Sequence, residues 1–93
     1  MKIRQYDNNN KGRFYIQAEG VTKAEMTYSY AGNDKIIIDH TEVDESLKGQ
    51  GVGYKLLESV VEFARTQNLK ILPLCPFTAS AFKKKTEYKD VLF

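Results

Sequence analysis

Residues 43–53 read Val-Asp-Glu-Ser-Leu-Lys-Gly-Gln-Gly-Val-Gly, and this glycine-rich stretch decides the fold that the rest of the sequence predicts. Glycine adopts dihedral angles that other residues avoid, so successive backbone N–H groups of such a stretch can point into one concavity. A helix that begins there adds unpaired N–H groups and about half a positive charge, which together stabilise a phosphate. We therefore expect an anion-binding turn, with Lys48 as a cation beside it.

The spacing of Gly49, Gly51 and Gly53 separates this turn from two better-known glycine motifs. A P-loop needs Gly-Lys followed by Ser or Thr, and no such tripeptide occurs in the sequence. The dinucleotide-binding motif needs G-x-G-x-x-G, whereas the pattern here is G-x-G-x-G. A plain turn at the start of a helix is the simpler alternative, and it stays open.

The glycines lie between the clearest predicted strand and the clearest predicted helix. Residues 35–43 contain three consecutive isoleucines, which is typical of a central strand covered on both faces. The spacing of apolar residues predicts a helix over residues 53–67, ending near Asn68. The apolar residues that recur at helical spacing are Leu56, Leu57, Val60, Val61 and Ala64.

A second short strand is predicted after this helix, over residues 69–75, with Pro73 marking a strand end or a bulge. Pairing of this strand with residues 35–43 would complete a β-α-β unit with parallel strands. Thr78 is the predicted cap of a last short helix that reaches about Lys85, and residues 87–93 are left unassigned.

The first half of the sequence predicts an antiparallel meander. Residues 3–6, 13–19 and 22–30 are the expected strands, joined by polar or glycine-containing turns. In the third of them Ala24, Met26, Tyr28 and Tyr30 alternate with polar residues, which indicates a half-buried strand. The expected fold class is therefore α/β, an α+β mixed sheet with antiparallel N-terminal strands, a β-α-β unit and a short C-terminal helix, in a single domain spanning residues 1–93.

Composition narrows the classes of function. The 93 residues are 42% apolar and 28% charged, as in ordinary globular domains, and the net charge of +2 gives no reason to expect nucleic acid or an anionic membrane as partner. No stretch approaches the roughly 20 apolar residues of a membrane span, and residues 1–6 lack the apolar core of a signal peptide. Cys75, the single cysteine, cannot form an internal disulfide, so we expect a cytoplasmic protein.

The glycine stretch and its surroundings resemble a known family. Residues 48–53, Lys-Gly-Gln-Gly-Val-Gly, are similar to the coenzyme A signature [R/Q]-x-x-G-x-[G/A] of the GNAT acetyltransferases, with Lys48 in the usual Arg or Gln position. Val43 precedes Lys48 by five residues, as in the strand-loop-helix arrangement of that family. The resemblance covers residues 36–88, is closest to the short, single-domain YjdJ-like group, and implies a minimal GNAT-like fold.

The resemblance also implies a ligand and an activity. Acetyl-coenzyme A would bind with its pyrophosphate on the backbone N–H groups of Gln50, Gly51, Val52 and Gly53, in the loop that starts with Lys48 and Gly49. The pantetheine arm would pair with backbone groups of Thr41 and Val43 as an additional strand. The expected activity is transfer of the acetyl group from the thioester to an amine, with no metal involved.

Catalytic residues are harder to assign because Lys83 occupies the position where the family usually has a catalytic tyrosine. Cys75 is the leading substitute, as an acid or as an acyl carrier, because its reference pKa of about 8.5 permits both roles. A buried cysteine with a packing role is the alternative. Tyr88 is a weaker candidate than Cys75, and packing is its simpler role. His40 and Glu42 share one face of their strand, and either is a candidate base for the amine, although a lone histidine on a strand is more often a hydrogen-bonded structural residue.

The acceptor amine is not specified by the sequence. Residues 7–12 leave no room for the two helices that build the acceptor groove in longer members of the family, so an open acceptor side is expected, for a small amine or for a protein or peptide amine. One alternative function is a non-catalytic coenzyme A binder. Another is a small basic RNA-binding domain that uses Tyr28, Tyr30 and the lysines of residues 83–85.

Overall fold

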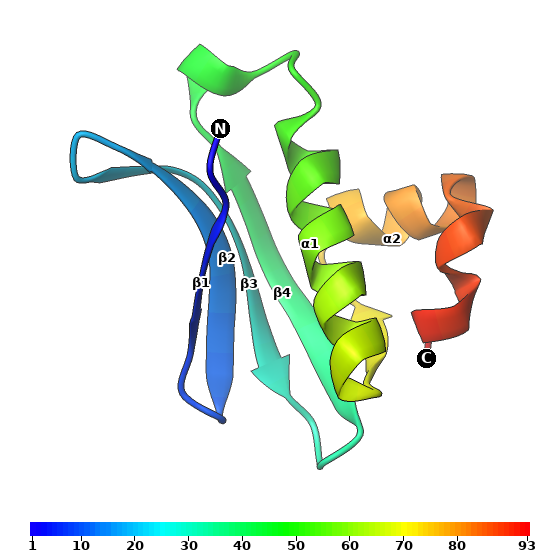
Figure 1. Ribbon diagram of the computed structural model, residues 1–93. Helices are drawn as coiled ribbons and strands as arrows, with labels where there is room; N and C mark the ends of the chain where they lie inside the picture. The colour runs from blue at the N-terminus through cyan, green and yellow to red at the C-terminus, as the bar shows by residue number, and fades with distance from the viewer.

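The computed structural model describes all residues from 1 to 93. Five strands, two α-helices and two short 3₁₀ helices follow one another along the chain (Figure 1). Their bounds are β1 Arg4–Asp7, β2 Lys11–Ala18, β3 Val21–Tyr30, β4 Lys35–Val43, η1 Glu45–Leu47, α1 Val52–Gln67, β5 Lys70–Pro73, α2 Pro76–Lys84 and η2 Thr86–Val91.

The strands form one mixed sheet in the order β1-β2-β3-β4-β5. Neighbouring strands are antiparallel except β4 and β5, which are parallel and connected through α1. This arrangement confirms the predicted antiparallel meander followed by a β-α-β unit. Figure 1 shows α1 along one face of the sheet, with α2 and η2 beyond it.

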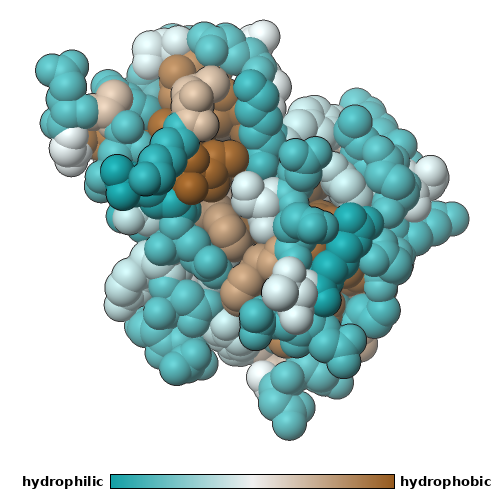
Figure 2. Space-filling model, in the orientation of Figure 1, coloured by the Kyte–Doolittle hydropathy of each residue, from teal (hydrophilic) through white to brown (hydrophobic).

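The hydrophobic core lies between α1 and one face of the sheet. The alternating residues Ala24, Met26 and Tyr28 of β3 are almost fully buried, as predicted. The predicted apolar face of α1, residues 56–64, is buried opposite them. The view in Figure 2 shows a mostly hydrophilic surface with apolar side chains exposed only in small separate areas. None of the helices combines the length and the apolar composition that crossing a membrane needs.

The prediction that residues 35–43 are covered on both faces is wrong. Ile36 and Ile38 are fully buried under α1, whereas Ile37 between them is only partly buried. α1 packs on the face with Ile36 and Ile38, and no side chain on the second face of β4 is fully buried, so that face is uncovered. A run of three isoleucines has no alternation from which one-sided burial can be recognised.

The prediction that Thr78 caps the last helix is also wrong. Cys75 is the residue before the first turn of α2, and Pro76 is the first helical residue, a position where its missing N–H costs nothing. Thr78 lies fully buried inside the helix, and its hydroxyl donates a hydrogen bond to the Cys75 carbonyl oxygen at 3.0 Å. The helix therefore begins three residues earlier than a Thr78 cap implies.

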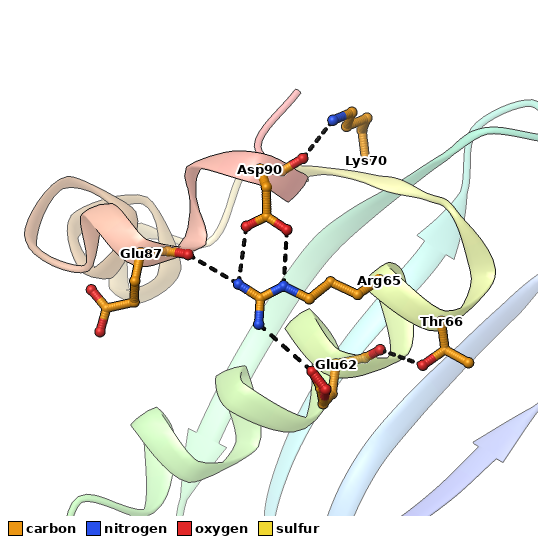
Figure 3. Close-up of polar contacts among 6 residues, drawn as sticks. All are labelled: Glu62, Arg65, Thr66, Lys70, Glu87 and Asp90. Atoms are coloured by element: carbon orange, nitrogen blue, oxygen red, sulfur yellow. Dashed lines mark hydrogen bonds and ion pairs between the residues drawn. The ribbon is translucent and has the colours of Figure 1, made fainter.

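The C-terminal residues are held against α1 and β5 by a polar network (Figure 3). Arg65 of α1 donates from Nε and Nη2 to the two carboxylate oxygens of Asp90, at 2.9 and 3.0 Å. The same Nη2 donates to the Glu87 carbonyl oxygen at 2.9 Å, and the Lys70 ammonium donates to the Asp90 carbonyl oxygen. Residues 87–93, unassigned by the sequence, thus close the β5 side of the fold, where Leu92 lies beside Ile71.

Replacing Asp90 with asparagine is expected to reduce stability at neutral pH and to have little effect in acid. The hydrogen bonds from Arg65 lower the pKa of the folded Asp90 carboxyl below its usual range. Its stabilisation is therefore present above the unfolded-state pKa of about 3.9 and disappears as pH falls through the folded-state pKa. Urea unfolding of both proteins at pH 7 and in acid measures this difference. A wild-type advantage that does not shrink in acid would argue against the ion pair, and Glu87→Gln, which removes an unpaired carboxylate nearby, is the control.

A second network connects β1 to β3 across the intervening strand β2. Tyr28 and Tyr30 donate from their hydroxyls to Asp7 Oδ2 at 2.5 and 2.7 Å, and Gln5 Nε2 donates to the Tyr28 hydroxyl at 2.9 Å. Burial and the hydrogen bond to Asp7 raise the pKa of Tyr30 to about 12. Because the Tyr28 ring is buried, it does not form the stacking surface that the RNA-binding alternative requires.

Gly12→Ala is expected to disrupt this network. A Cβ atom on Gly12 would lie 2.5 Å from both the Tyr28 hydroxyl and the Tyr6 carbonyl oxygen, and the backbone oxygen cannot move away independently. Overpacking of this kind costs about 1–3 kcal/mol of unfolding free energy, measurable by urea titration. Gln17→Ala, at an exposed position of the same strand, should cost no more than about 0.5 kcal/mol. Equal losses in the two variants would contradict the proposed close approach.

Candidate functional site

The glycine turn has the backbone conformation of an anion-binding loop. Gly49 and Gly51 have φ angles of 81° and 71°, in the left-handed region that favours glycine. A Cβ atom at either position would meet no protein atom within 4 Å, so the space beside both residues is open. These two glycines therefore leave room for a ligand against the backbone.

The amides of this turn have no backbone partners. The first hydrogen bond of α1 runs from the Lys55 N–H to the Gly51 carbonyl oxygen at 3.1 Å, and the N–H groups of residues 49–54 have no backbone acceptor. No side chain caps this end of α1, and its first turn contains no acidic residue. Donors without partners at the positive end of a 16-residue helix are suited to a phosphate group.

Gly53 has a different role from the other two glycines. It lies in the first turn of α1, where a Cβ atom would be 2.8 Å from Cζ of the Phe77 ring. The absence of a side chain therefore lets α1 approach α2 closely. All three glycines were predicted from the sequence to bind the ligand, and for Gly53 the structure adds a packing role.

A cavity of about 330 Å³ opens above the turn. Its lining residues come from β4, the turn and both helices: Thr41, Val43, Leu47, Lys48, Gly49, Gly51, Val52, Gly53, Tyr54 and Phe77. Gln50 is not among them, and its side chain reaches instead to the Ser46 carbonyl oxygen at 3.4 Å. Lys48 pairs with Glu45 at 3.3 Å on the surface. Leu47, Tyr54 and Phe77 were not predicted as site residues, and nothing in the sequence places Phe77 beside the distant glycine turn.

A β-bulge in β4 determines which side chains of this strand face the cavity. Thr27 of β3 pairs with His40 and Tyr28 pairs with Ile38, so that Asp39 has no partner. The extra residue reverses the alternation of side chains beyond it. Thr41 therefore lies on the same face as the buried Ile38, whereas strict alternation would have placed His40 there.

Beyond Ile38 the edge of β4 on the β5 side is unpaired. Pairing with β5 ends at Pro73, after which the Leu74 and Cys75 N–H groups both donate to the Ile38 carbonyl oxygen at 3.2 Å. On the opposite edge of β4, the Asp44 N–H donates to the carbonyl oxygen of Lys23 in β3 at 2.7 Å. Because backbone groups alternate along a strand, those of Thr41 and Val43 face the unpaired edge.

Cys75 lies where this edge meets the start of α2. Its side chain is buried, and Sγ lies 3.3 Å from Thr41 Oγ1, in a hydrogen bond. Burial raises the pKa of the thiol, but its hydrogen bond with the Thr41 hydroxyl and the backbone N–H groups of Thr78 and Phe77 outweigh burial, so that the net effect lowers the pKa. The thiolate is thus favoured relative to an ordinary cysteine.

The other candidate catalytic residues do not join Cys75. His40 Nε2 and Glu42 Oε1 lie 3.5 Å apart, both exposed, on the sheet face opposite α1. Glu42 there lines a hollow of about 340 Å³ together with Arg13 of β2, Lys23 of β3 and neighbouring residues. Tyr88 is buried against Phe82 with ring centroids 6.1 Å apart, which is a packing role.

Comparison with known proteins assigns the family. Residues 13–91 match the model of the GCN5-related N-acetyltransferases. The chain belongs to this family. Its place in the YjdJ-like group remains a prediction.

Solved and curated relatives agree with this assignment. A GCN5-like protein from Staphylococcus aureus, determined by solution NMR, is 45% identical, with a TM-score of 0.79 over 99% of this chain and 87% of that one. The GCN5 structure from Tetrahymena has the same fold at 15% identity, with a TM-score of 0.65 over 84% of this chain and 51% of that chain. Protein NATD1 of Xenopus tropicalis is 26% identical over 78% of this chain and 68% of its own length.

Proposed function

We propose that this member of the GCN5-related family binds acetyl-coenzyme A and transfers its acetyl group to an amine. The observation that carries the proposal is the row of unpaired amide N–H groups at residues 49–54, beside glycines that leave open space. A diphosphate there would accept several hydrogen bonds from fixed donors at the positive end of α1.

The unpaired edge of β4 supports a position for the pantetheine arm. The arm carries amide groups, which can pair with the backbone groups of Thr41 and Val43 as an added strand does. The edge begins beside the glycine turn and leads to Cys75, so an arm along it would bring the thioester carbonyl to the Cys75 thiol.

We further propose that Cys75 carries the acyl group. Its thiolate attacks the thioester carbonyl carbon, a new carbon–sulfur bond forms, the bond to the coenzyme A sulfur breaks, and the departing thiolate takes up a proton from water. A neutral amine then attacks the acyl-cysteine, the amide forms and Cys75 leaves as a thiolate. The lowered pKa of the thiol favours this role over that of a proton donor, which needs the protonated form.

The amine must lose a proton during this reaction, and the face opposite α1 offers the candidates. His40 and Glu42 are exposed there. We propose that the acceptor approaches from this uncovered face and that one of the two residues takes the proton through water, because neither contacts Cys75. A small amine and a protein or peptide amine both fit such an open face.

A non-catalytic coenzyme A binder is the second candidate. Only 6% of the Cys75 surface is exposed, and an enclosed thiol is difficult for an acceptor amine to reach.

One experiment separates the acetyltransferase from the non-catalytic binder. The protein is incubated with acetyl-coenzyme A, with and without a panel of amines and lysine-containing peptides, and free thiol and acetylated product are measured. Catalytic release of coenzyme A that depends on an amine supports the transferase. Saturable binding without thiol release or acetylated product supports the binder.

A further inference from the structure

Two aromatic side chains and a lysine form a cluster at the α1 end of the 330 Å³ cavity. Tyr54 and Phe77 both line the cavity, and their rings pack edge to face with centroids 5.2 Å apart. Lys85, the residue directly after α2, places Nζ 5.4 Å from the centroid of the Tyr54 ring. The ammonium group therefore lies beside the ring of Tyr54, which lines the cavity and directly follows Gly53 in the chain.

The charge of Lys85 has no acidic partner. The ion pairs of the chain engage Arg13, Lys35, His40, Lys48 and Arg65, and none includes Lys85. Lys85 is half-buried, whereas Lys83 and Lys84 of the same basic run are exposed. Packing over an aromatic ring restricts the side chain, so that less freedom is lost when it binds an anion.

We propose that Lys85 recognises the 3′-phosphate of coenzyme A and makes the site selective for the phosphorylated nucleotide. This inference rests on the proposed function, which places the diphosphate on the amides of residues 49–54. The pantetheine arm leaves that diphosphate toward β4, so the nucleotide leaves it on the other side, toward Tyr54 and the end of α2. A phosphomonoester there carries close to two negative charges at neutral pH. Lys85 is the cation that the fold holds at this point, and Tyr54 and Phe77 position it.

The test compares coenzyme A with dephospho-coenzyme A, which differ only in the 3′-phosphate, by calorimetric titration of the full chain. Wild type should bind coenzyme A about tenfold more tightly, as expected for one charge-assisted contact. Lys85→Gln should lose this preference by weakening coenzyme A alone, with dephospho-coenzyme A unchanged. Lys83→Gln removes the same charge from an exposed position of the same run and should keep the preference.

Three results would overturn the inference while leaving the proposed function intact: equal affinity of wild type for the two ligands, an equal loss for both in Lys85→Gln, or the same loss of preference in Lys83→Gln. Failure of wild type to bind either ligand would instead remove the proposed function, and this inference with it. Thermal unfolding of both variants verifies that they remain folded at the titration temperature.

Discussion

Gly51→Val is expected to weaken coenzyme A binding by at least about 100-fold. A branched side chain is incompatible with the φ angle of 71° at this position and would project into space that no protein atom occupies. The loop would have to rearrange, and the amides of residues 50–53 would no longer converge on one phosphate. Losing two charge-assisted hydrogen bonds of about 1.5–3 kcal/mol each accounts for a change of this size. Calorimetric titration measures it directly.

Gly20→Val is the matched control. Gly20 has a φ angle of 78° and no protein atom within 4 Å of the position of a Cβ atom, but it lies in the turn between β2 and β3. Both variants should lose a similar amount of stability, about 1–3 kcal/mol, because both force a branched residue into a left-handed conformation. Only Gly51→Val should lose the ligand. Equal loss of binding in the two variants would mean that general destabilisation, and not the loop, explains the result.

Cys75→Ala is expected to reduce acetyl transfer by about 100-fold to 10,000-fold while changing coenzyme A affinity no more than about twofold. The thiol is proposed to act on the thioester carbonyl, whereas binding depends on backbone groups that the substitution leaves in place. Intact mass after incubation with acetyl-coenzyme A should show one added acetyl group on wild type and none on the variant. Cys75→Ser, which replaces the thiol with a hydroxyl of similar size, should also lose the acetyl adduct.

The pH dependence of coenzyme A release tests the same step. Because the thiol pKa is lowered in the folded protein, the rate should rise with pH to a midpoint below the ordinary value of about 8.5. A Cys75→Ala protein that still transfers acetyl groups at the wild-type rate would remove Cys75 from the mechanism and favour direct attack by the amine on the thioester.

The order of elements and the glycine turn could be predicted because each rests on a local pattern. The apolar residues that recur at helical spacing identify α1: Leu56, Leu57, Val60, Val61 and Ala64. The glycines directly before this helix indicate a turn with dihedral angles that other residues avoid. The parallel pairing of β4 with β5 follows from the helix that connects them. Together these features determine the backbone of the candidate site, so that much of it is predictable from the sequence alone.

The features that the sequence did not predict depend on contacts between distant residues. The bulge at Asp39 arises from pairing with β3, and it alone determines that Thr41 and not His40 meets Cys75. Phe77 reaches the cavity because Gly53 lets α2 approach, a relation across 24 positions that no local pattern records. Thr78 has the residue type of a cap, but Pro76 starts the helix before it.

The proposed function depends on a diphosphate held by the chain's own amides between β4 and α1. The most direct measurement is a titration of the ¹⁵N-labelled wild-type protein with coenzyme A, followed by amide NMR. We expect the largest shifts at the amides of residues 49–54, with further shifts at Thr41 and Val43. Shifts confined to the uncovered face of the sheet, or none at millimolar coenzyme A, would contradict this binding mode.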